Sequence, residues 1–423
     1  MIVIKNNTLK NIVTLMTGTL GAQVFALAIT PVITRLYAPD QYGMMGMFLA
    51  IIIVLVPISA LTLPAAIVLP KLDEDAKSLA FISIMLSAVF SIFLFIVLLI
   101  ALNPLVERFN LESIKWLLLL VPVTMFFSTF HQVFEQWMIR NKQFKFISKI
   151  SIFQSLSLNG SKAVTGLFAP FGSSLIVLTS LGYAIHSVLF FFSGGKTLLR
   201  DIVNLKKSNQ YYWQLLKRYI DFPVFRAPNV FLNLASQSLP ILFLATTFGP
   251  TAAGFYTLAR TMMNIPATLI GKAVGDVFYP KLSELKINKL PIYSLFAKTT
   301  LILAALGIIP YLTVFLFGEF LFGLVFGAKW SAAGVYAGWL SSWIYTIFLS
   351  PLCTNILAVI NRQGFNLLNT IIKVAVRTLI LIGCIYYKIS AIESVILFSV
   401  ASATINIIFI LVVLYMVKKH DEH

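Results

Sequence analysis

Long apolar runs, separated by short polar connections, occupy most of this chain. Each run reaches the length of about 20 residues that a helix needs to cross the hydrocarbon core of a bilayer. The pattern therefore predicts an all-α integral membrane protein with about twelve transmembrane helices. From the apolar runs we expect these helices at residues 12–34, 42–69, 79–102, 115–137, 149–170, 173–196, 219–248, 253–279, 293–317, 331–360, 367–387 and 391–417.

The composition fits a lipid environment and leaves little room for a soluble domain. Hydrophobic residues make up 59% of the chain and charged residues 11%, whereas roughly 25% of residues are charged in ordinary soluble domains. The connections are short and contain no nucleophile–base pair, metal-ligand cluster or phosphate-binding loop. We therefore predict neither an enzyme nor a metal site, and no cofactor.

The positive charge of the chain lies mainly on one predicted side of the membrane. A net charge of +17 would indicate nucleic acid binding in a soluble protein. Here the basic residues concentrate in the N-terminus, alternate loops and the C-terminal tail, and the opposite loops hold only Arg35, Arg108, Lys115, Lys329 and Lys388. The positive-inside rule then predicts that both termini are cytoplasmic, without a nucleic acid partner.

Short motifs recur at a spacing of half the chain. Pro39-Asp-Gln-Tyr-Gly43 is followed about 210 residues later by Pro250-Thr-Ala-Ala-Gly254, and Pro70-Lys-Leu-Asp-Glu74 is followed at a similar distance by Pro280-Lys-Leu-Ser-Glu284. The common offset indicates a duplication. Two parallel sets of six helices related by an axis along the membrane normal are typical of transporters in which lobes rock about a central site.

The duplication predicts the domain organisation. We expect an N-terminal six-helix lobe at residues 1–200, a basic cytoplasmic linker at 201–218 and a C-terminal six-helix lobe at 219–423.

Basic residues inside the predicted helices are the most unusual feature of the chain. A charge at the bilayer centre costs roughly 2.5–3.5 kcal/mol on insertion scales. Acids in the same segments are fewer (Glu135, Asp221 and Asp276), so the surplus implies a hydrated cavity, an anionic ligand or both. The cations are Lys162, Arg226, Arg260, Lys272, Lys298, Lys373 and Arg377.

Some of these cations also fit ordinary structural roles. Lys272 and Asp276 are placed to pair on one helix face, and Lys298 and Lys373 are close enough to the inner boundary to snorkel. Arg226 follows Asp221 closely and fits an ion pair as well as a ligand site.

The remaining cations form the predicted substrate-binding cavity. Arginine suits a phosphate or pyrophosphate group because its planar fork binds bidentately and stays charged. Arg35, at the outer end of the first helix, fits lipid headgroups equally well. The predicted cavity residues are Arg35, Lys162, Arg226, Arg260 and Arg377.

Prolines and histidines add two weaker predictions. Proline removes a backbone hydrogen bond and bends a helix, so we expect gates or static kinks at Pro57, Pro64, Pro223, Pro228 and Pro266. Of the histidines, His186 lies mid-span, where it fits either a proton relay or a hydrogen-bonded structural role.

The stretches Ile33–Gly43, Asp221–Pro228 and Gly254–Arg260, with Pro266, resemble motifs of bacterial polysaccharide biosynthesis membrane proteins. These are the O-antigen and capsule (Wzx-type) flippases of the multidrug/oligosaccharidyl-lipid/polysaccharide (MOP) exporter superfamily. The resemblance implies an inner-membrane protein that moves undecaprenyl-pyrophosphate-linked oligosaccharides to the periplasmic leaflet by alternating access. It carries over to Arg35, Arg226 and Arg260.

The resemblance also implies partners. These are the lipid-linked glycan, membrane lipids, and a polysaccharide polymerase with other assembly proteins. Some family members use an H⁺ or Na⁺ gradient, but no dedicated carboxylate for such an ion is evident in the N-terminal half.

Three alternatives are open at this point. A multidrug antiporter of the same superfamily would carry embedded acids for cationic drugs, which is the opposite balance. A peptidoglycan lipid II flippase shares the cationic chemistry but usually has two further helices. A membrane scaffold or an integral glycosyltransferase is the third, although a transferase would need a sizeable acidic loop.

Overall fold

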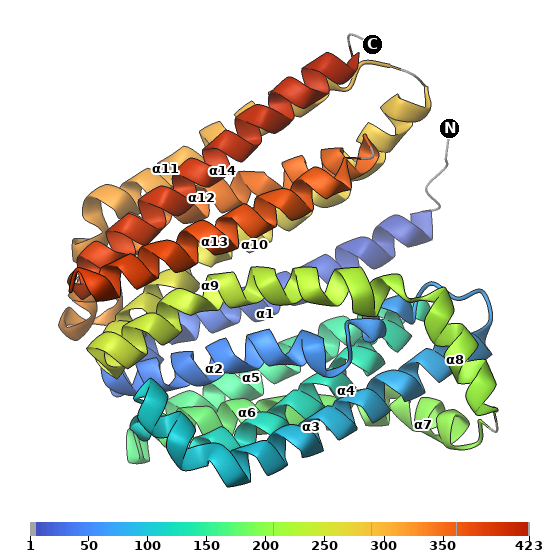
Figure 1. The fold of residues 1–423 in the computed structure, drawn as a ribbon, viewed down its shortest axis with the longest axis horizontal. Coiled ribbons are helices and arrows are strands. Elements are labelled where there is room, and N and C mark those ends of the chain that lie inside the picture. Colours follow the sequence, from blue (N-terminus) through green and yellow to red (C-terminus); the bar gives the residue numbers. More distant parts are fainter. Residues whose placement is uncertain (1–5, 206, 289, 361, 422–423) are drawn as a thin grey trace. The chain divides into compact units, whose positions relative to one another are not determined.

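The computed structural model describes residues 6–205, 207–288, 290–360 and 362–421, and these are helical apart from short turns (Figure 1). Side chains at 6–16, 193–194, 269–277, 279–280, 283, 287, 358 and 363 lie outside the description. The α-helices are α1 (Asn6–Leu36), α2 (Pro39–Ser59), α3 (Asp73–Phe109), α4 (Leu120–Arg140), α5 (Phe144–Phe168), α6 (Gly172–Phe190), α7 (Lys196–Val203), α8 (Asn209–Arg218), α9 (Ala227–Phe248), α10 (Pro250–Ile287), α11 (Tyr293–Phe326), α12 (Ser331–Val359), α13 (Gln363–Tyr386) and α14 (Ala391–Asp421).

Short 3₁₀ and π turns join several of these helices. The turns are η1 (Leu63–Ala66), η2 (Glu112–Ile114), η3 (Trp116–Leu119), η4 (Phe191–Gly195), η5 (Phe222–Arg226) and η6 (Ala328–Trp330).

Ten helical segments of the described chain are long and apolar enough to cross a membrane. They coincide with all but two of the predicted segments, and the other two, 149–170 and 253–279, fall on α5 and α10. The prediction of an all-helical chain with many spanning-length apolar helices is confirmed. That α5 and α10 also cross, and that both termini are cytoplasmic, stay predictions.

The described chain forms two compact units, Met1–Ser238 and Leu239–His423, which divide within α9. The predicted lobes 1–200 and 219–423 stay a prediction, because compactness does not test a duplication. The segment predicted as a linker, 201–218, is mostly helical, since it contains the end of α7 and all of α8.

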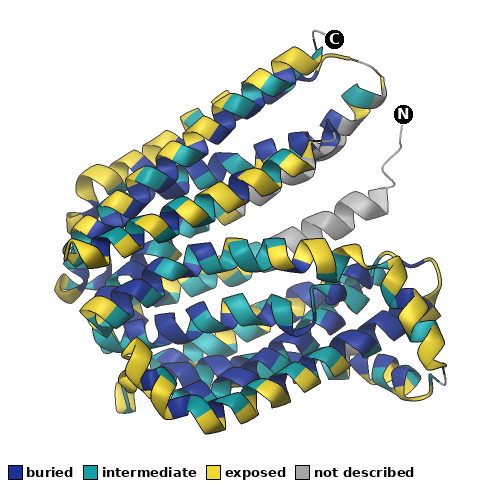
Figure 2. Ribbon diagram, in the orientation of Figure 1, coloured by how far each residue is buried: buried dark blue, intermediate teal, exposed yellow. Residues whose placement is uncertain are grey.

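Apolar side chains cover the outer faces of the helices. In Figure 2 buried and exposed residues alternate along the same helices, with buried faces turned to neighbouring helices of the unit. On α3 the exposed face carries large apolar side chains at helical spacing, namely Val89, Ile92, Phe93, Ile96 and Ile100. A helix that is apolar on its exposed face needs lipid around it, which agrees with the multi-pass membrane prediction.

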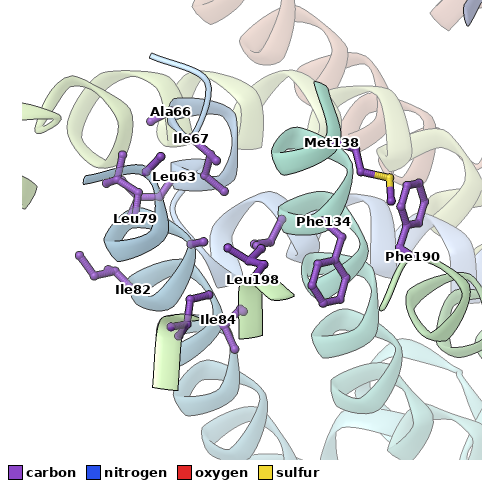
Figure 3. Packing of buried hydrophobic residues seen from close by; sticks show 14 of the residues in the cluster. Leu63, Ala66, Ile67, Leu79, Ile82, Ile84, Phe134, Met138, Phe190 and Leu198 are labelled. Carbon is purple, nitrogen blue, oxygen red and sulfur yellow. The ribbon is translucent and has the colours of Figure 1, made fainter. Parts of the chain in front are cut away.

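A buried apolar core holds α7 and α8 against the other helices of the first unit (Figure 3). Leu198 of α7 and Leu215 of α8 are buried together with Leu79 of α3 and Phe134 of α4. Removing such side chains from water stabilises the packing by about 1.5–3 kcal/mol each. The segment after α6 is therefore a packed amphipathic element.

Ion pairs reinforce this packing at the start of α3. The Arg140 guanidinium at the end of α4 donates to Asp73 at 2.8 Å and to the carbonyl of Pro70 at 2.6 Å. Asp75 accepts from Arg218 at 3.2 Å and from the hydroxyl of Tyr211. Burial is the main cause that raises the pKa of Tyr211 to about 12, and the hydrogen bond to Asp75 is the second cause. The phenol therefore stays a donor at physiological pH.

The Asp75→Asn variant is expected to loosen α8. Asp75 is buried, and hydrogen bonds to a charged group of this kind are worth about 1.5–3 kcal/mol each. We expect a lower melting temperature and faster cleavage near residues 204–208 in limited proteolysis. Glu74→Gln is the matched control, because its pair with Lys207 joins a side chain that is 63% exposed and should contribute at most about 1 kcal/mol. Equal protease resistance of Asp75→Asn and the native protein would contradict this clamp.

Candidate functional site

The structure separates the predicted cavity residues by burial and by unit. In the first unit Lys162 of α5 is buried, whereas Arg35 at the end of α1 and Arg226 in η5 are exposed. Arg260 of α10 and Arg377 of α13 both belong to the second unit. Arg377 is only 4% exposed, and Arg260 is half-buried.

Arg377 packs against two aromatic rings from different helices. Its guanidinium carbon is 4.8 Å from the ring centroid of Trp343 on α12 and 5.5 Å from that of Phe398 on α14. The two rings meet edge to face, with centroids 5.1 Å apart. Its Nε donates a hydrogen bond to the Ser402 hydroxyl at 3.0 Å. Three helices therefore fix the orientation of one buried cation, because cation–π contacts strengthen when water is excluded.

Further positive charge lies around Arg377. Arg260 and Arg377 interact electrostatically with each other and with Tyr256, which is completely buried. Lys373 is four residues before Arg377 on α13 and interacts electrostatically with it. The Lys373 ammonium lies 5.0 Å from the ring centroid of Phe409. We call Arg260, Lys373 and Arg377 the cationic cluster.

Buried polar groups near the cluster retain unused hydrogen-bonding capacity. Among the described residues, the hydroxyl of Tyr256, Nε1 of Trp343 and Oδ1 of Asn406 are buried and lack a hydrogen-bond partner. The Asn406 amide donates to Thr346 at 2.8 Å, so this side chain is only half satisfied. An unmatched buried polar group costs about 1–3 kcal/mol, and a site that carries several of them is prepared for a polar ligand or water.

The arrangement of the cluster suits an anion rather than a cation. Cations that interact electrostatically in a low-dielectric interior repel, and an anionic group placed among them relieves that repulsion. The aromatic rings hold the guanidinium in place by packing. The cluster can therefore bind and orient a phosphate-like group.

Lys162 makes a different and sparser site in the first unit. Its ammonium donates to the Met45 thioether at 3.6 Å, a weak acceptor. Its backbone carbonyl accepts from the Tyr37 hydroxyl at 3.0 Å, which ties α5 to the end of α1. Lys162 is 8% exposed, so an ammonium with a thioether acceptor carries a large desolvation cost.

Arg226 and Lys298 are exposed cations with surroundings of their own. The Arg226 guanidinium carbon lies 5.2 Å from the Phe222 ring, which holds it at the start of the span. Lys298 is exposed on α11, in agreement with snorkelling, whereas Lys373 is half-buried and belongs to the cluster. The side chains of Lys272 and Asp276 lie outside the described residues, so their predicted pair stays a prediction.

The predicted gate prolines occupy three kinds of position. Pro57 lies inside α2 and Pro266 inside α10. Pro64 lies beyond the end of α2, in η1, and Pro223 lies in η5. Pro228 is the second residue of α9 and directly follows the π turn η5, so it lies inside a continuous helical stretch. Gating by any of them stays a prediction.

The sequence reading missed the partners that surround Arg377. Trp343, Phe398 and Tyr256 are ordinary apolar-segment residues when each helix is considered alone. A signal did exist on α14, where Ser399, Ser402 and Asn406 form a polar stripe at helical spacing in an otherwise apolar span. Such a stripe indicates a face that packs against polar partners.

Two relatives match more than half of the chain. It is 24% identical over 243 residues to the teichuronic acid biosynthesis protein TuaB of Bacillus subtilis, covering 57% of this chain and 48% of the relative. It is 21% identical over 302 residues to an uncharacterized membrane protein in the cps region of Klebsiella pneumoniae, covering 71% and 60%. The chain thus spans between about half and three fifths of the length of these relatives.

Solved structures show the same fold. The lipid II flippase MurJ in an inward closed conformation matches with a TM-score of 0.73 and 14% identity, covering 96% of this chain and 87% of that one. An inward-facing multidrug resistance MATE family transporter of the MOP superfamily matches with a TM-score of 0.65 and 15% identity, covering 96% and 95%. At such low identity the similarity concerns the fold.

Residues 32–334, more than half of the chain, match a family described as polysaccharide biosynthesis protein. The apolar helices, the MOP-type fold and the membrane-protein relatives together make this a multi-pass protein of the inner membrane. The chain belongs to the polysaccharide biosynthesis protein family.

Proposed function

We propose that this protein is a flippase that moves an undecaprenyl-pyrophosphate-linked oligosaccharide from the cytoplasmic to the periplasmic leaflet by alternating access. The glycan would be a repeat unit of O-antigen, capsule or exopolysaccharide. The observation that carries the proposal is the cationic cluster in the second unit, in which Arg377 is buried and Arg260 and Lys373 are half-buried. Family membership and the glycan-related names of the relatives support it.

The cluster matches the chemistry of the proposed substrate. Every such lipid carries a strongly charged pyrophosphate, which must pass through the membrane interior. A guanidinium held by two aromatic rings provides a preorganised donor, which lowers the cost of ordering on binding. We propose that Arg377 and Arg260 bind this head group directly, and that Lys162, Arg35 and Arg226 contact it at other stages.

Two other transport functions share this fold, and charge and family membership argue against them. A multidrug antiporter for cationic compounds would have to place its substrate against the cationic cluster, which repels it. A lipid II flippase would use the same pyrophosphate chemistry, so the difference between it and this proposal lies in the sugar. The polysaccharide biosynthesis family favours a surface glycan. We propose no catalytic activity, and we propose a polysaccharide polymerase among the partners.

The proposed function predicts a specific lipid phenotype. Deletion of the gene in the source bacterium should remove the surface polysaccharide and accumulate undecaprenyl-linked repeat units on the cytoplasmic side. Purified protein in liposomes should then translocate that intermediate at least tenfold faster than lipid II or an organic cation dye. Translocation of the dye alone would favour the antiporter, and equal rates with lipid II would favour the peptidoglycan precursor.

A further inference from the structure

Two histidines from different helices stack inside the first unit. His131 of α4 and His186 of α6 have ring centroids 4.1 Å apart and ring planes inclined by 28°. Phe190 lies against both rings, with centroid distances of 5.2 Å to His131 and 5.0 Å to His186. His186 is 5% exposed, so the pair lies in an apolar, aromatic pocket.

One nitrogen of this pair is buried and unsatisfied. Nε2 of His186 has no hydrogen-bond partner among the described residues. The neighbouring Ser187 hydroxyl is already committed, since it donates to the carbonyl of Phe127 at 2.7 Å. A buried polar atom without a partner is costly and indicates a role beyond packing. In the tautomer that carries its proton on Nδ1, the lone pair of this nitrogen is a place where a further proton can bind.

Few other ionisable groups lie close to the histidine pair. His186 interacts electrostatically with His131, and Glu135 lies one turn from His131 on the same face of α4. Tyr183 lies about one turn before His186 on α6. The ionisable groups of the other packed helices lie farther along the unit: Lys77 beside Trp137, Tyr42 near the start of α6, the exposed Lys149, and Lys162 beyond the contact of Leu158 with Gly182.

Stacking limits the pair to a single proton. One imidazolium is stabilised by the face of the neighbouring imidazole, on which it stacks. Two positive charges about 4 Å apart would repel by about 4 kcal/mol at an effective dielectric constant of about 20. The pair therefore has two relevant states, neutral and singly protonated.

We propose that His131 and His186 form a one-proton binding site that links transport to a proton gradient. This inference rests on the proposed flippase function. The proton is taken from water on one side and bound at an imidazole nitrogen. It is returned to water on the other side, with no other reactant.

The linkage follows from the burial of the pair. The enclosed pocket fits neutral rings, because an isolated buried charge is expensive. A protonated pair favours a conformation in which water reaches Nε2 of His186. Proton binding therefore favours the opening of this pocket, and opening favours proton binding to the same extent.

Direct titration tests the proton site without any substrate. The chain has four histidines, so a His420→Gln, His423→Gln variant leaves only the pair. Nuclear magnetic resonance of histidine-labelled protein in nanodiscs, from about pH 8 to about pH 4, covers the ordinary imidazole range. We expect the two rings to titrate together and to bind one proton in total. Two protons bound independently, or none over the whole range, would overturn the proposal.

Transport measurements test the linkage. In liposomes with an internal pH dye, native protein should move protons with the lipid-linked glycan, and His186→Gln should reduce that proton movement at least tenfold. Binding of the glycan to His186→Gln should be unchanged, and His131→Gln provides a second variant if the first is unstable. Unaltered proton movement in both would refute the linkage. A native protein that moves no glycan but binds one proton refutes the flippase function and leaves the proton site intact.

Discussion

Replacing Arg377 by alanine is expected to abolish translocation of the lipid-linked glycan. The substitution removes a buried cation, its hydrogen bond to Ser402 and its contacts with Trp343 and Phe398. Truncating one partner of a buried, hydrogen-bonded charge interaction costs about 2–5 kcal/mol, which corresponds to a loss of roughly 30-fold to several thousand-fold. The rate of glycan movement in liposomes and the amount of surface polysaccharide measure the effect.

Matched variants separate charge from packing. Arg377→Met keeps much of the side-chain volume and removes the charge, so it should be as inactive as alanine. Arg377→Lys keeps the charge without the planar fork and should retain partial activity. Lys298→Ala removes an exposed cation from α11 and should behave as native. Full activity of Arg377→Met in a protein of native abundance would contradict a cationic binding site.

The helical framework was predictable because hydropathy reports it directly. A run of spanning length has few alternatives to a helix in a bilayer, and the predicted segments coincide with helices throughout the chain. The errors occur where an apolar sequence does not mean a helix. Residues 60–69 are apolar, but Leu61 and Thr62 adopt φ of 51° and 55°, so α2 ends at Ser59. Hydropathy carries no signal for that backbone turn.

The segment that follows α6 is helical, which its sequence does not indicate. Its charges resemble a solvated linker, but Leu198, Ile202 and Leu215 fall on faces that bury against the rest of the first unit. Over helices as short as α7 and α8, an amphipathic period is hard to distinguish from scattered apolar residues.

The candidate site was predictable only in part. Arg260 and Arg377 stand out in the sequence because the cost of charge in a membrane depends on position in the span. Their proximity, and the rings that hold Arg377, depend on how α10, α12, α13 and α14 pack, which no local pattern reveals. Lys373 illustrates the limit, since its distance from the helix end fits snorkelling while packing makes it part of the cluster.

Substituting Gly334 is expected to cause the largest loss of folded protein. In the second unit α11 and α12 approach so closely that a Cβ at Gly334 would lie 2.1 Å from the carbonyl oxygen of Gly318. The obstacle is backbone, so it can be relieved only by separating the helices. Lipid offers no hydrophobic force to restore them, because membrane helices associate through close packing of small residues. Gly334 and Gly338 form the Gly-x-x-x-Gly spacing typical of such contacts.

We expect Gly334→Ala to destabilise the protein by about 3 kcal/mol, the upper end for overpacking, and Gly334→Val to leave almost no folded material. Size-exclusion profiles and thermal melting in detergent measure both. Gly383→Ala is the matched control, since a Cβ there meets nothing within 4 Å. Gly323→Ala adds a second, because its Cβ would make only an ordinary contact at 3.5 Å with Ser331. Native-like melting of Gly334→Val would show that α11 and α12 do not pack backbone to backbone.

Because α12 carries Trp343, separation of these helices should also displace one of the rings that hold Arg377. Any folded Gly334→Ala protein is therefore expected to bind the glycan more weakly than either control.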